Sequence, residues 1–374
     1  VIGVKGAVSM IEPDAELILD ANAGCVYLNP SETILDEYFR LEHDRLQEKE
    51  RLDKLRDIPA ATRDQQRITL RANIGLLSDI TIARRNGAEG VGLYRTEFPY
   101  MARSSFPDRE DQYQLYKRVI EEFNGAPVTI RTLDIGGDKA LPYFCPPQED
   151  NPFMGWRSVR FSLDNREIFQ TQIEAILMAA IHGPIRLLFP MISNIEEIRS
   201  CKVIVQEAMQ NLQRLNLPYA EDIPIGAMIE VPAAVRLAPH LAKEVDFFAL
   251  GTNDLIQYLL AADRSNNLVQ RYYDPLHPAV LLSLEYLANV ARDHQTDLCL
   301  CVEIAPAPVC LMMLIGIGIR QFSLSAPYIP RLKEFIGLLD TKEAAQLAQQ
   351  ALTMADGREI RAMLQGSIEK LSIH

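Results

Sequence analysis

From about residue 60 onward, runs of apolar, β-favouring residues alternate with longer stretches of helical character. Several of these runs are hydrophobic without a break, which is typical of strands buried on both faces. Eight strand–helix units in succession predict a (β/α)8 barrel with insertions. A doubly wound open sheet is the structural alternative, but it gives no reason for eight repeats. The predicted strands are 68–72, 90–94, 128–132, 185–190, 225–229, 247–250, 298–301 and 321–324.

The first part of the chain has a different pattern. Short apolar stretches at 1–8, 15–19 and 25–28 are separated by turn residues and predict small strands. Ser31 is placed to cap a helix, and the charge-rich stretch that follows carries leucines at near-helical spacing until Pro59 stops it. We therefore divide the chain into 1–32, a linker helix at 33–58 and a barrel at 59–374.

Composition narrows the function. The chain has 374 residues, 48% of them hydrophobic, with a formal net charge of -12 and a pI near 5.1. This balance argues against a general nucleic-acid surface, although a few arginines in one cleft can still bind an anion. No apolar run approaches the roughly 20 residues that span a bilayer, so no membrane segment is expected.

The ends and the cysteines give two further expectations. The six cysteines form no CxxC pair and no zinc pattern, which indicates reduced thiols and a cytoplasmic protein. The first residue is Val, so we expect a processed chain or a fragment.

In a (β/α)8 barrel, functional side chains gather at the carboxyl ends of the strands. Polar and ionisable residues lie at or just after nearly every predicted strand end, although ordinary loops are also polar. They are Asn73, Arg95, Glu97, Arg131, Asp134, Asp138, Lys139, Glu230, Asn253, Asp254, Cys301, Glu303, Ser323 and Ser325.

Arg95 and Arg131 end two adjacent strands, and Arg264 is a third candidate for the same ligand. A guanidinium presents a planar fork that binds phosphate oxygens, so the arrangement indicates a phosphate site. The structural alternative is that each arginine pairs with a nearby acid such as Glu97 or Asp134.

Glu230 and Asp254 come from neighbouring strand ends. Two carboxylates together with phosphate oxygens are ligands that Mg²⁺ accepts, because it keeps several waters and needs few protein groups. A general acid–base pair, or capping of the next helix by Asp254, remain alternatives.

Cys301 lies at the predicted end of the seventh strand, where a thiol can be a nucleophile, a general acid or a buried structural residue. Cys299 would point to the same side of that strand. The chain has no Walker A or GxGxxG motif, so nucleotide sites of those types are unsupported.

Several long strings resemble enzyme I of the bacterial phosphotransferase system, within the wider family of phosphoenolpyruvate-utilising enzymes. They are GAEGVGLYRTEF at 87–98, RTLDIGGDK at 131–139, NPFMGWR at 151–157, FPMI at 189–192, LAKEVDFFALGTNDLIQY at 241–258 and the DR at 263–264. The resemblance runs along the whole chain. It implies a (β/α)8 barrel that binds phosphoenolpyruvate with Mg²⁺, releases pyruvate and forms a homodimer through the barrel.

The resemblance also assigns roles, position by position. Phosphate binding falls to Arg95 and Arg131, metal binding to Glu230 and Asp254, and substrate contacts to Asn253 and Arg264, with Arg157 also lining the site. Cys301 is implied as the acid that protonates the enolate of pyruvate. These positions coincide with the strand ends identified from the pattern.

In the family, a histidine in a Thr-Ser-His type motif of a swivelling domain takes the phosphoryl group and passes it to a small HPr-like carrier protein. Residues 1–32 resemble the end of that domain, and none of this chain's histidines lies in such a motif. We expect phosphoenolpyruvate binding but no stable phosphoenzyme from this chain alone. The histidines are His43, His182, His240, His277, His294 and His374.

The family has a sugar-transport branch and a nitrogen-related branch, and this chain is more similar to the second. The strings that carry this likeness are SFPDREDQY at 105–113, PVTIRTLDIG at 127–136, YYDPLHPAVL at 272–281 and VCLMMLIGIGIR at 309–320. The sensory GAF domain that usually precedes the nitrogen-related form is absent from this sequence.

One loop departs from the family pattern of Cys-Gly-Glu followed by a small-Gly-Asp turn. Val302 and Pro306 stand where the family has glycines, and Ala307 where it has an aspartate. Valine does not readily take a positive φ, and proline fixes φ and removes an N–H. The first hypothesis is therefore a phosphoenolpyruvate–protein phosphotransferase, and the alternative is a phosphoenolpyruvate-sensing module with impaired turnover. A third is a relative of pyruvate–phosphate dikinase or phosphoenolpyruvate synthase, although the nucleotide-binding domain of those enzymes is not present.

Overall fold

The computed structural model describes residues 6, 10–21, 23–137, 139, 141–144, 148–302 and 307–372. The chain divides into two compact units, Val1–Lys54 and Leu55–His374. The predicted strand at 1–8, and Asp138, Glu303 and Pro306 of the sequence analysis, lie outside the described residues apart from Gly6.

The first unit contains a hairpin and a helix. β1 (Leu17–Asp20) pairs antiparallel with β2 (Cys25–Leu28), close to the predicted strands at 15–19 and 25–28. Helix α2 (Glu32–Asp53) follows, with Ser31 at the N-cap position but without a side-chain capping hydrogen bond. The Tyr38 hydroxyl donates to Asp20 at 2.7 Å, so the helix is tied to the hairpin.

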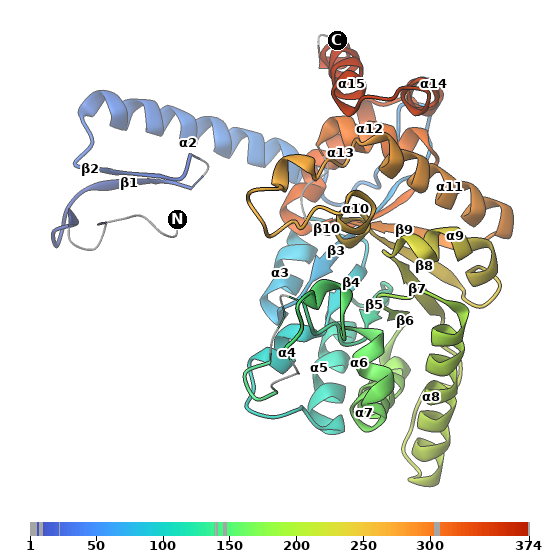
Figure 1. Ribbon diagram of the computed structural model, residues 1–374. Helices are drawn as coiled ribbons and strands as arrows, with labels where there is room; N and C mark the ends of the chain where they lie inside the picture. The colour runs from blue at the N-terminus through green and yellow to red at the C-terminus, as the bar shows by residue number, and fades with distance from the viewer. Residues whose placement is uncertain are drawn as a thin grey trace. The chain divides into compact units, whose positions relative to one another are not determined.

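The second unit is built on a closed barrel of eight parallel strands, ordered β10-β3-β4-β5-β6-β7-β8-β9 (Figure 1). The (β/α)8 prediction is confirmed, and each predicted strand matches an observed one within about three residues at either end. The strands are β3 (Thr69–Ile74), β4 (Val91–Arg95), β5 (Val128–Arg131), β6 (Ile185–Phe189), β7 (Ile225–Ile229), β8 (Phe247–Gly251), β9 (Asp297–Cys301) and β10 (Gln321–Ser325).

Helices follow the strands and cover the outside of the barrel (Figure 1). The longer ones are α3 (Leu77–Arg85), α5 (Arg109–Glu122), α7 (Arg166–Ala179), α8 (Ile195–Arg214), α9 (Pro232–Leu241), α10 (Thr252–Leu260), α11 (Pro278–His294), α12 (Pro308–Gly316) and α13 (Ile329–Leu338). The short elements are α4 (Glu97–Met101), α6 (Val159–Asp164), η1 (Pro152–Met154), η2 (Ala180–His182), η3 (Gln270–Tyr272) and η4 (Ala326–Tyr328), and the chain ends with α14 (Thr341–Leu352) and α15 (Gly357–Ser372).

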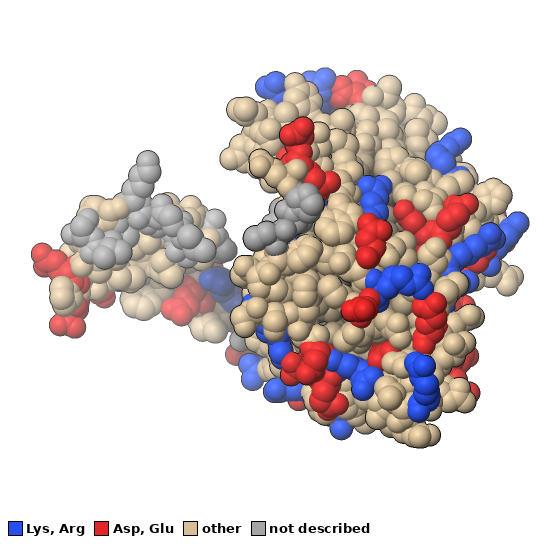
Figure 2. All heavy atoms as spheres, turned by 60° about the horizontal axis from the view of Figure 1, so that its bottom comes forward, with Lys and Arg blue, Asp and Glu red and all other residues tan. Residues whose placement is uncertain are grey.

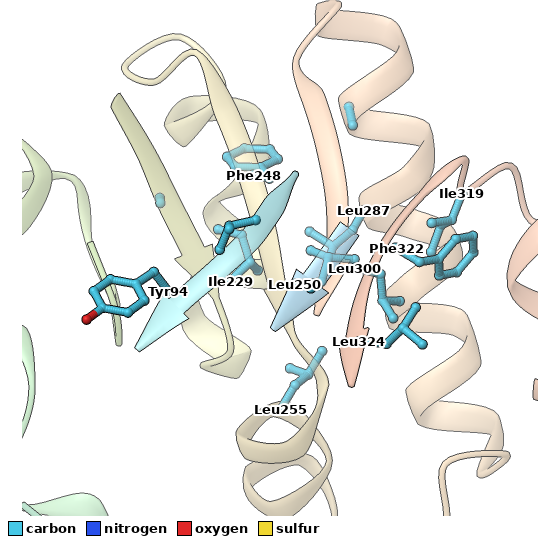
Figure 3. Close-up of a cluster of buried hydrophobic side chains, with 14 of the residues drawn as sticks. Tyr94, Ile229, Phe248, Leu250, Leu255, Leu287, Leu300, Ile319, Phe322 and Leu324 are labelled. Carbon is cyan, nitrogen blue, oxygen red and sulfur yellow. The ribbon is translucent and has the colours of Figure 1, made fainter. Parts of the chain in front are cut away.

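The alternation of side chains along each strand separates two cores. On β3, Leu70, Ala72 and Ile74 face the helices and belong to the main hydrophobic core, so Arg71 and Asn73 face the barrel interior. Figure 3 shows the outer core on several strands and helices, with Phe248, Leu250 and Leu300 among its members. A second, smaller cluster fills the interior itself, formed by Leu93, Leu188, Met228, Phe247, Ala249 and Cys301.

Charged side chains of both signs are interspersed over the face of the molecule shown in Figure 2. Such a surface does not resemble the continuous basic stripe of a nucleic-acid interface. Across the described part of the chain, no helix has the length and apolarity required to cross a membrane.

Candidate active site at the carboxyl ends of the strands

A small cavity of about 30 Å³ lies at the carboxyl ends of the strands. Its lining includes seven of the eight residues that the sequence selects, the exception being Arg157. The side chains come from strands that are far apart in sequence but adjacent in the barrel. The lining is Asn73, Leu93, Arg95, Arg131, Lys139, Met228, Glu230, Gly251, Thr252, Asn253, Asp254, Arg264 and Cys301.

An ionic cluster, which we define as Glu97, Arg131, Asp134, Lys139 and Arg157, reaches the cavity through Arg131 and Lys139. The Arg131 guanidinium forms an ion pair with Glu97 and lies 3.1 Å from an Asp134 oxygen. The Lys139 ammonium lies 3.1 Å from Glu97 and 2.7 Å from Asp134. The sequence analysis offered pairing with acids as the alternative to phosphate binding, and Arg131 makes these pairs while it also lines the cavity.

The cluster holds its two carboxylates in the charged form. Burial alone would raise the pKa of Glu97, but Arg131 and Lys139 outweigh it and lower the pKa. Burial likewise opposes the charge on Asp134, yet Lys139, Arg131 and Arg157 hold its pKa well below the ordinary value. The three cations are therefore matched by carboxylates that stay ionised at neutral pH.

A glycine turn brings Lys139 back to this cluster. Gly136 and Gly137 have φ values of +104° and +66°, which other residues rarely adopt. A Cβ at Gly136 would lie 2.4 Å from the Cβ of Arg157. The close approach of the two segments therefore requires glycine at 136.

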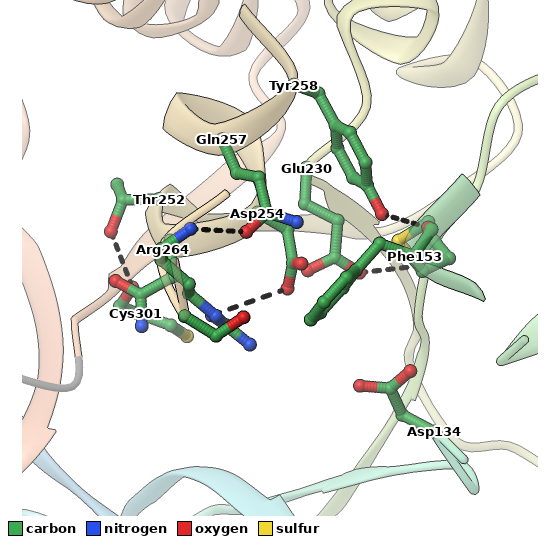
Figure 4. A network of polar contacts seen from close by, with 12 residues as sticks. Asp134, Phe153, Glu230, Thr252, Asp254, Gln257, Tyr258, Arg264 and Cys301 are labelled. Atoms are coloured by element: carbon green, nitrogen blue, oxygen red, sulfur yellow. Dashed lines mark hydrogen bonds and ion pairs between the residues drawn. The ribbon is translucent and has the colours of Figure 1, made fainter. Parts of the chain in front are cut away.

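The structure places Arg157 behind the cavity rather than on its surface. Its side chain is 1% exposed, and its guanidinium bridges Asp134 at 3.1 Å and Asp254 at 3.2 Å. It also donates to the Tyr258 hydroxyl at 3.3 Å, and Tyr258 in turn donates to the carbonyl of Phe153 (Figure 4). Arg157 thus orients Asp254 instead of lining the cavity.

Glu230 and Asp254 face the cavity from the end of β7 and the first turn of α10 (Figure 4). Glu230 accepts a hydrogen bond from the Met191 backbone N–H at 2.7 Å, and Asp254 lies 3.9 Å from the Arg264 guanidinium. Burial and the neighbouring Asp254 raise the pKa of Glu230 to about 7. Arg131 and Arg157 act in the opposite direction but do not outweigh burial and the neighbouring carboxylates, and a bound cation would lower this pKa further.

The space next to these carboxylates is kept open by Gly251, because a Cβ there would lie 2.3 Å from a Glu230 oxygen. Among the residues that the structure covers, no group of three or more His, Cys, Asp and Glu side chains could hold a metal. A two-carboxylate site fits Mg²⁺, which completes its octahedron with waters and ligand oxygens.

Cys301 ends β9, where it pairs with Gly251 of the neighbouring β8, and is 5% exposed. A hydrogen bond with the Cys299 thiol, together with burial, raises the pKa of Cys301 well above its ordinary value. A thiol in this environment stays protonated at neutral pH and can act as an acid, whereas a nucleophilic cysteine needs a lowered pKa.

Val302, the residue after Cys301, is held by two hydrogen bonds of its backbone. The Val302 N–H donates to the Ser323 carbonyl at 2.9 Å, and its own carbonyl accepts from Asn73 at 2.7 Å. The β-branched residue therefore continues the main-chain pairing of β9 with β10. Of the three substituted loop positions, Pro306 falls outside the described residues, whereas Val302 and Ala307 fall inside them.

The sequence analysis named Lys139 near a strand end but gave it no role, and it did not single out Thr252 or Tyr258. Lys139 and Thr252 lie within the strings RTLDIGGDK and GTND. These family-like strings were the feature of the sequence from which the two residues could have been identified. Tyr258 lies on α10 four residues after Asp254, a spacing that places both on one face of a helix.

A (β/α)8 barrel whose mouth combines arginines, two carboxylates and a protonated thiol defines a class of protein that binds a small anion at the strand ends. The family model described as the PEP-binding domain of PEP-utilising enzymes matches residues 49–340. The chain therefore belongs to the family of phosphoenolpyruvate-utilising enzymes.

Curated relatives agree with this assignment. The chain is 41% identical to the phosphoenolpyruvate-protein phosphotransferase of Buchnera aphidicola subsp. Acyrthosiphon pisum over 98% of its own length and 64% of that protein. It is 40% identical to the protein of the same name from Haemophilus influenzae, again over 98% and 64%. The chain thus spans about 64% of the length of these relatives.

Among solved structures, the chain is similar to a citrate lyase from Burkholderia xenovorans LB400, with a TM-score of 0.46 and 13% identity. The match covers 83% of this chain and 93% of that one, and it is too distant to bear on function.

Proposed function

We propose that this chain binds phosphoenolpyruvate with Mg²⁺ at the barrel mouth and serves phosphoryl transfer from it to a histidine, with release of pyruvate. The observation that carries the proposal is the cavity lined together by Arg95, Arg131, Arg264, Glu230, Asp254 and Cys301. These groups match the parts of the ligand: guanidinium forks suit its phosphate, and the thiol suits the carbon that must be protonated. The family of the chain supports the same ligand.

The proposed role of the arginines follows from the charge of the transferring group. The transferring phosphoryl group carries negative charge that arginines at fixed positions stabilise, because their dipoles need not reorganise during the reaction. As the histidine nitrogen bonds to phosphorus, the bond from phosphorus to the enolate oxygen breaks, and the enolate keeps the electron pair. Arg131 is held in place for this role by the ionic cluster rather than left to rotate.

Glu230 and Asp254 are the residues that would hold Mg²⁺, which supplies further stabilisation of charge on the phosphate and enolate oxygens. The raised pKa of Glu230 fits this role, since it reports two buried carboxylates side by side. Arg157 orients Asp254 by an ion pair at 3.2 Å, as outer partners of metal-binding carboxylates do.

Cys301 then acts as the acid. Its thiol donates a proton to the methylene carbon of the enolate, a C–H bond forms from the enolate electron pair, and the thiol becomes a thiolate. The raised pKa of Cys301 keeps the thiol protonated until the enolate forms, so a proton is available for the transfer.

The remaining features of the proposal rest on the family resemblance. Residues 1–32 are the end of a swivelling phosphohistidine domain, 33–58 a linker helix and 59–374 the phosphoenolpyruvate-binding barrel. The phosphoryl group passes from the histidine to a small HPr-like carrier protein, and the barrel forms a homodimer in the cytoplasm. The similarity to the nitrogen-related branch stays a prediction.

A second candidate function is a phosphoenolpyruvate-sensing regulatory module with impaired turnover. The observation that favours it is the loop after Cys301, where valine, proline and alanine replace two glycines and an aspartate of the family pattern. The arginines and carboxylates of the cavity would still bind the ligand in such a protein.

The first experiment is calorimetry of phosphoenolpyruvate binding, with and without Mg²⁺. We expect Mg²⁺-dependent binding that Arg264→Ala weakens by about 10-fold or more, since the lost ion pair to a ligand phosphate is charge-assisted. Asp254, the buried carboxylate 3.9 Å from the Arg264 guanidinium, keeps its ion pair with Arg157 at 3.2 Å in this variant. Arg358→Ala is the matched control, because that side chain is 91% exposed and lies on α15.

Absence of binding to the wild-type chain would contradict both candidate functions. Binding without catalysis of any step at the methylene carbon would favour the regulatory module.

A further inference from the structure

The backbone carbonyls of Cys301 and of the next residue, Val302, accept hydrogen bonds from side chains of other elements. The Thr252 hydroxyl, at the start of α10, donates to the Cys301 carbonyl at 3.2 Å (Figure 4). The Asn73 amide, on β3, donates to the Val302 carbonyl at 2.7 Å. Two successive carbonyls at the end of β9 are therefore each bound by a side chain more than 45 residues away in sequence.

Asn73 is itself oriented by Ser323 on β10, whose hydroxyl donates to the Asn73 side-chain oxygen at 2.6 Å. Ser323 is fully buried and also accepts, through its main-chain carbonyl, the N–H of Val302 at 2.9 Å. The Asn73 side chain is thus oriented by two hydrogen bonds: its oxygen accepts from the Ser323 hydroxyl, and its NH₂ group donates to the Val302 carbonyl.

Ser323 has little freedom to leave this position. A Cβ at Gly92, on the neighbouring β4, would lie 2.3 Å from the Ser323 hydroxyl oxygen and 3.1 Å from the Cβ of Arg71. Gly92 therefore lets the serine pack against the strand, and the packing in turn fixes the direction of its hydroxyl.

We infer that Asn73, Thr252 and Ser323 form a thiol clamp, a set of positioning residues that fixes the backbone of Cys301 and so holds its thiol over the methylene carbon of the enolate. This inference rests on the proposed function and deepens it. Displacement of a reacting group by about 1 Å can cost about 100-fold in rate, so a proton donor at a strand end needs such support.

The thiol clamp also bears on the altered loop. Its three members lie on β3, β10 and the start of α10, and none belongs to the loop after Val302. The clamp can keep the acid in place although Val302, Pro306 and Ala307 differ from the family pattern. The inference therefore predicts that the chain retains protonation chemistry at the methylene carbon.

The test uses pyruvate itself as the probe, with Mg²⁺ and D₂O, and follows loss of the methyl signal by proton NMR. In this exchange the minor thiolate form of Cys301 takes a proton from the methyl carbon and the carbonyl becomes an enolate. The S–H then exchanges with D₂O, and the S–D returns a deuteron to the carbon, which restores the thiolate and the carbonyl. Phosphoenolpyruvate binding to each variant is measured separately by calorimetry, and folding is checked by circular dichroism.

We expect Thr252→Val and Ser323→Ala each to lower the exchange rate by about 10-fold or more, and Ser323→Ala to change phosphoenolpyruvate binding less than about 2-fold. Thr252→Ser, which keeps the hydroxyl, should retain most of the rate. Ser323→Ala is the sharpest variant because Ser323 does not line the cavity, so a loss of exchange there cannot come from a lost ligand contact. Ser283→Ala is its matched control, a serine whose hydroxyl donates to a backbone carbonyl at 2.7 Å on α11.

Equal exchange by the wild type, Thr252→Val and Ser323→Ala would overturn the thiol clamp and leave the proposed function standing. Ligand binding by the wild type without any exchange would also overturn the clamp and would support the regulatory module instead. A wild-type chain that neither binds phosphoenolpyruvate nor exchanges pyruvate protons would overturn the proposed function itself.

Discussion

The two sides of the barrel mouth are built in different ways. On one side, the ionic cluster holds Arg131 by direct ion pairs to buried carboxylates, Glu97 and Asp134. On the other, the thiol clamp holds Cys301 by hydrogen bonds between neutral groups, from Thr252 at 3.2 Å and through Val302 from Asn73 at 2.7 Å. One side fixes a side chain, and the other fixes the backbone that carries a side chain.

The difference follows from what each group must do. An arginine that binds phosphate must remain charged, and buried carboxylates keep it so while they set its position. An acid that delivers a proton must remain neutral until the enolate forms, and a carboxylate beside it would add a charge that the thiol does not need. Neutral hydrogen bonds to the backbone position the thiol without changing its charge.

The largest effect is expected from Arg131→Ala. Removal of the guanidinium leaves Glu97 and Asp134 buried with fewer partners, which should lower the free energy of unfolding by about 3 to 5 kcal/mol. Binding of phosphoenolpyruvate should also be lost. Urea denaturation and calorimetry measure the two effects.

The double variant Arg131→Met with Glu97→Gln separates the effect on stability from the effect on phosphoenolpyruvate binding. It removes one cation together with one of its carboxylates, so stability should recover while phosphoenolpyruvate binding stays absent. Recovery of binding along with stability would mean that Arg131 serves only the fold.

Asp134→Asn should be the next most severe change, at about 3 kcal/mol near neutral pH, because Arg131, Lys139 and Arg157 all lose a charged partner. The pKa of Asp134 is depressed in the folded state, so its stabilising effect is complete above the ordinary carboxyl pKa and is lost as the pH falls through the folded value. The stability gap between wild type and variant should be constant from pH 8 to pH 5 and should shrink below about pH 4.

Urea midpoints measured across this pH range give the gap directly. A gap that already closes between pH 7 and pH 5 would show that Asp134 is not held in its charged form by the three cations.

Glu230→Gln tests the carboxylate pair without breaking the ionic cluster. We expect Mg²⁺-dependent phosphoenolpyruvate binding to weaken by about 100-fold or more, because a direct ligand should matter at least as much as an outer partner of the metal. Folding stability should not fall, because burial opposes the ionisation of Glu230 and a glutamine oxygen can still accept the Met191 N–H. Binding that remains equally Mg²⁺-dependent in this variant would remove Glu230 from the proposed metal site.

The smallest effect concerns thiol reactivity. Cys301 is 5% exposed and its pKa is raised by its hydrogen bond with Cys299 and by burial, whereas Cys25 is exposed. Iodoacetamide at pH 8 should therefore label Cys25 well before Cys301, as peptide mass spectrometry can follow. Cys299→Ala should speed the labelling of Cys301 modestly, and faster labelling of Cys301 than of Cys25 in the wild type would contradict a protonated, buried acid.

The barrel fold and the positions of most residues of the candidate site could be predicted from the sequence alone. Buried strands in α/β proteins appear in the sequence as uninterrupted apolar runs. Eight such runs in succession, separated by helices, are compatible with only a few sheet topologies. Parallel strands bring their carboxyl ends to one rim, so Arg95, Glu230 and Cys301 had to lie near one another once the barrel was predicted. The resemblance to a family then assigned roles to the same positions.

Only the tertiary structure decided how these side chains are held. Arg157 was expected to line the site, but the fold places it behind Asp254, where it bridges two carboxylates. Ser323 and Asn73 meet although they are 250 residues apart, because β10 closes the barrel against β3. Such contacts depend on strand register and on the packing of single side chains, which no local pattern of apolar and polar residues encodes.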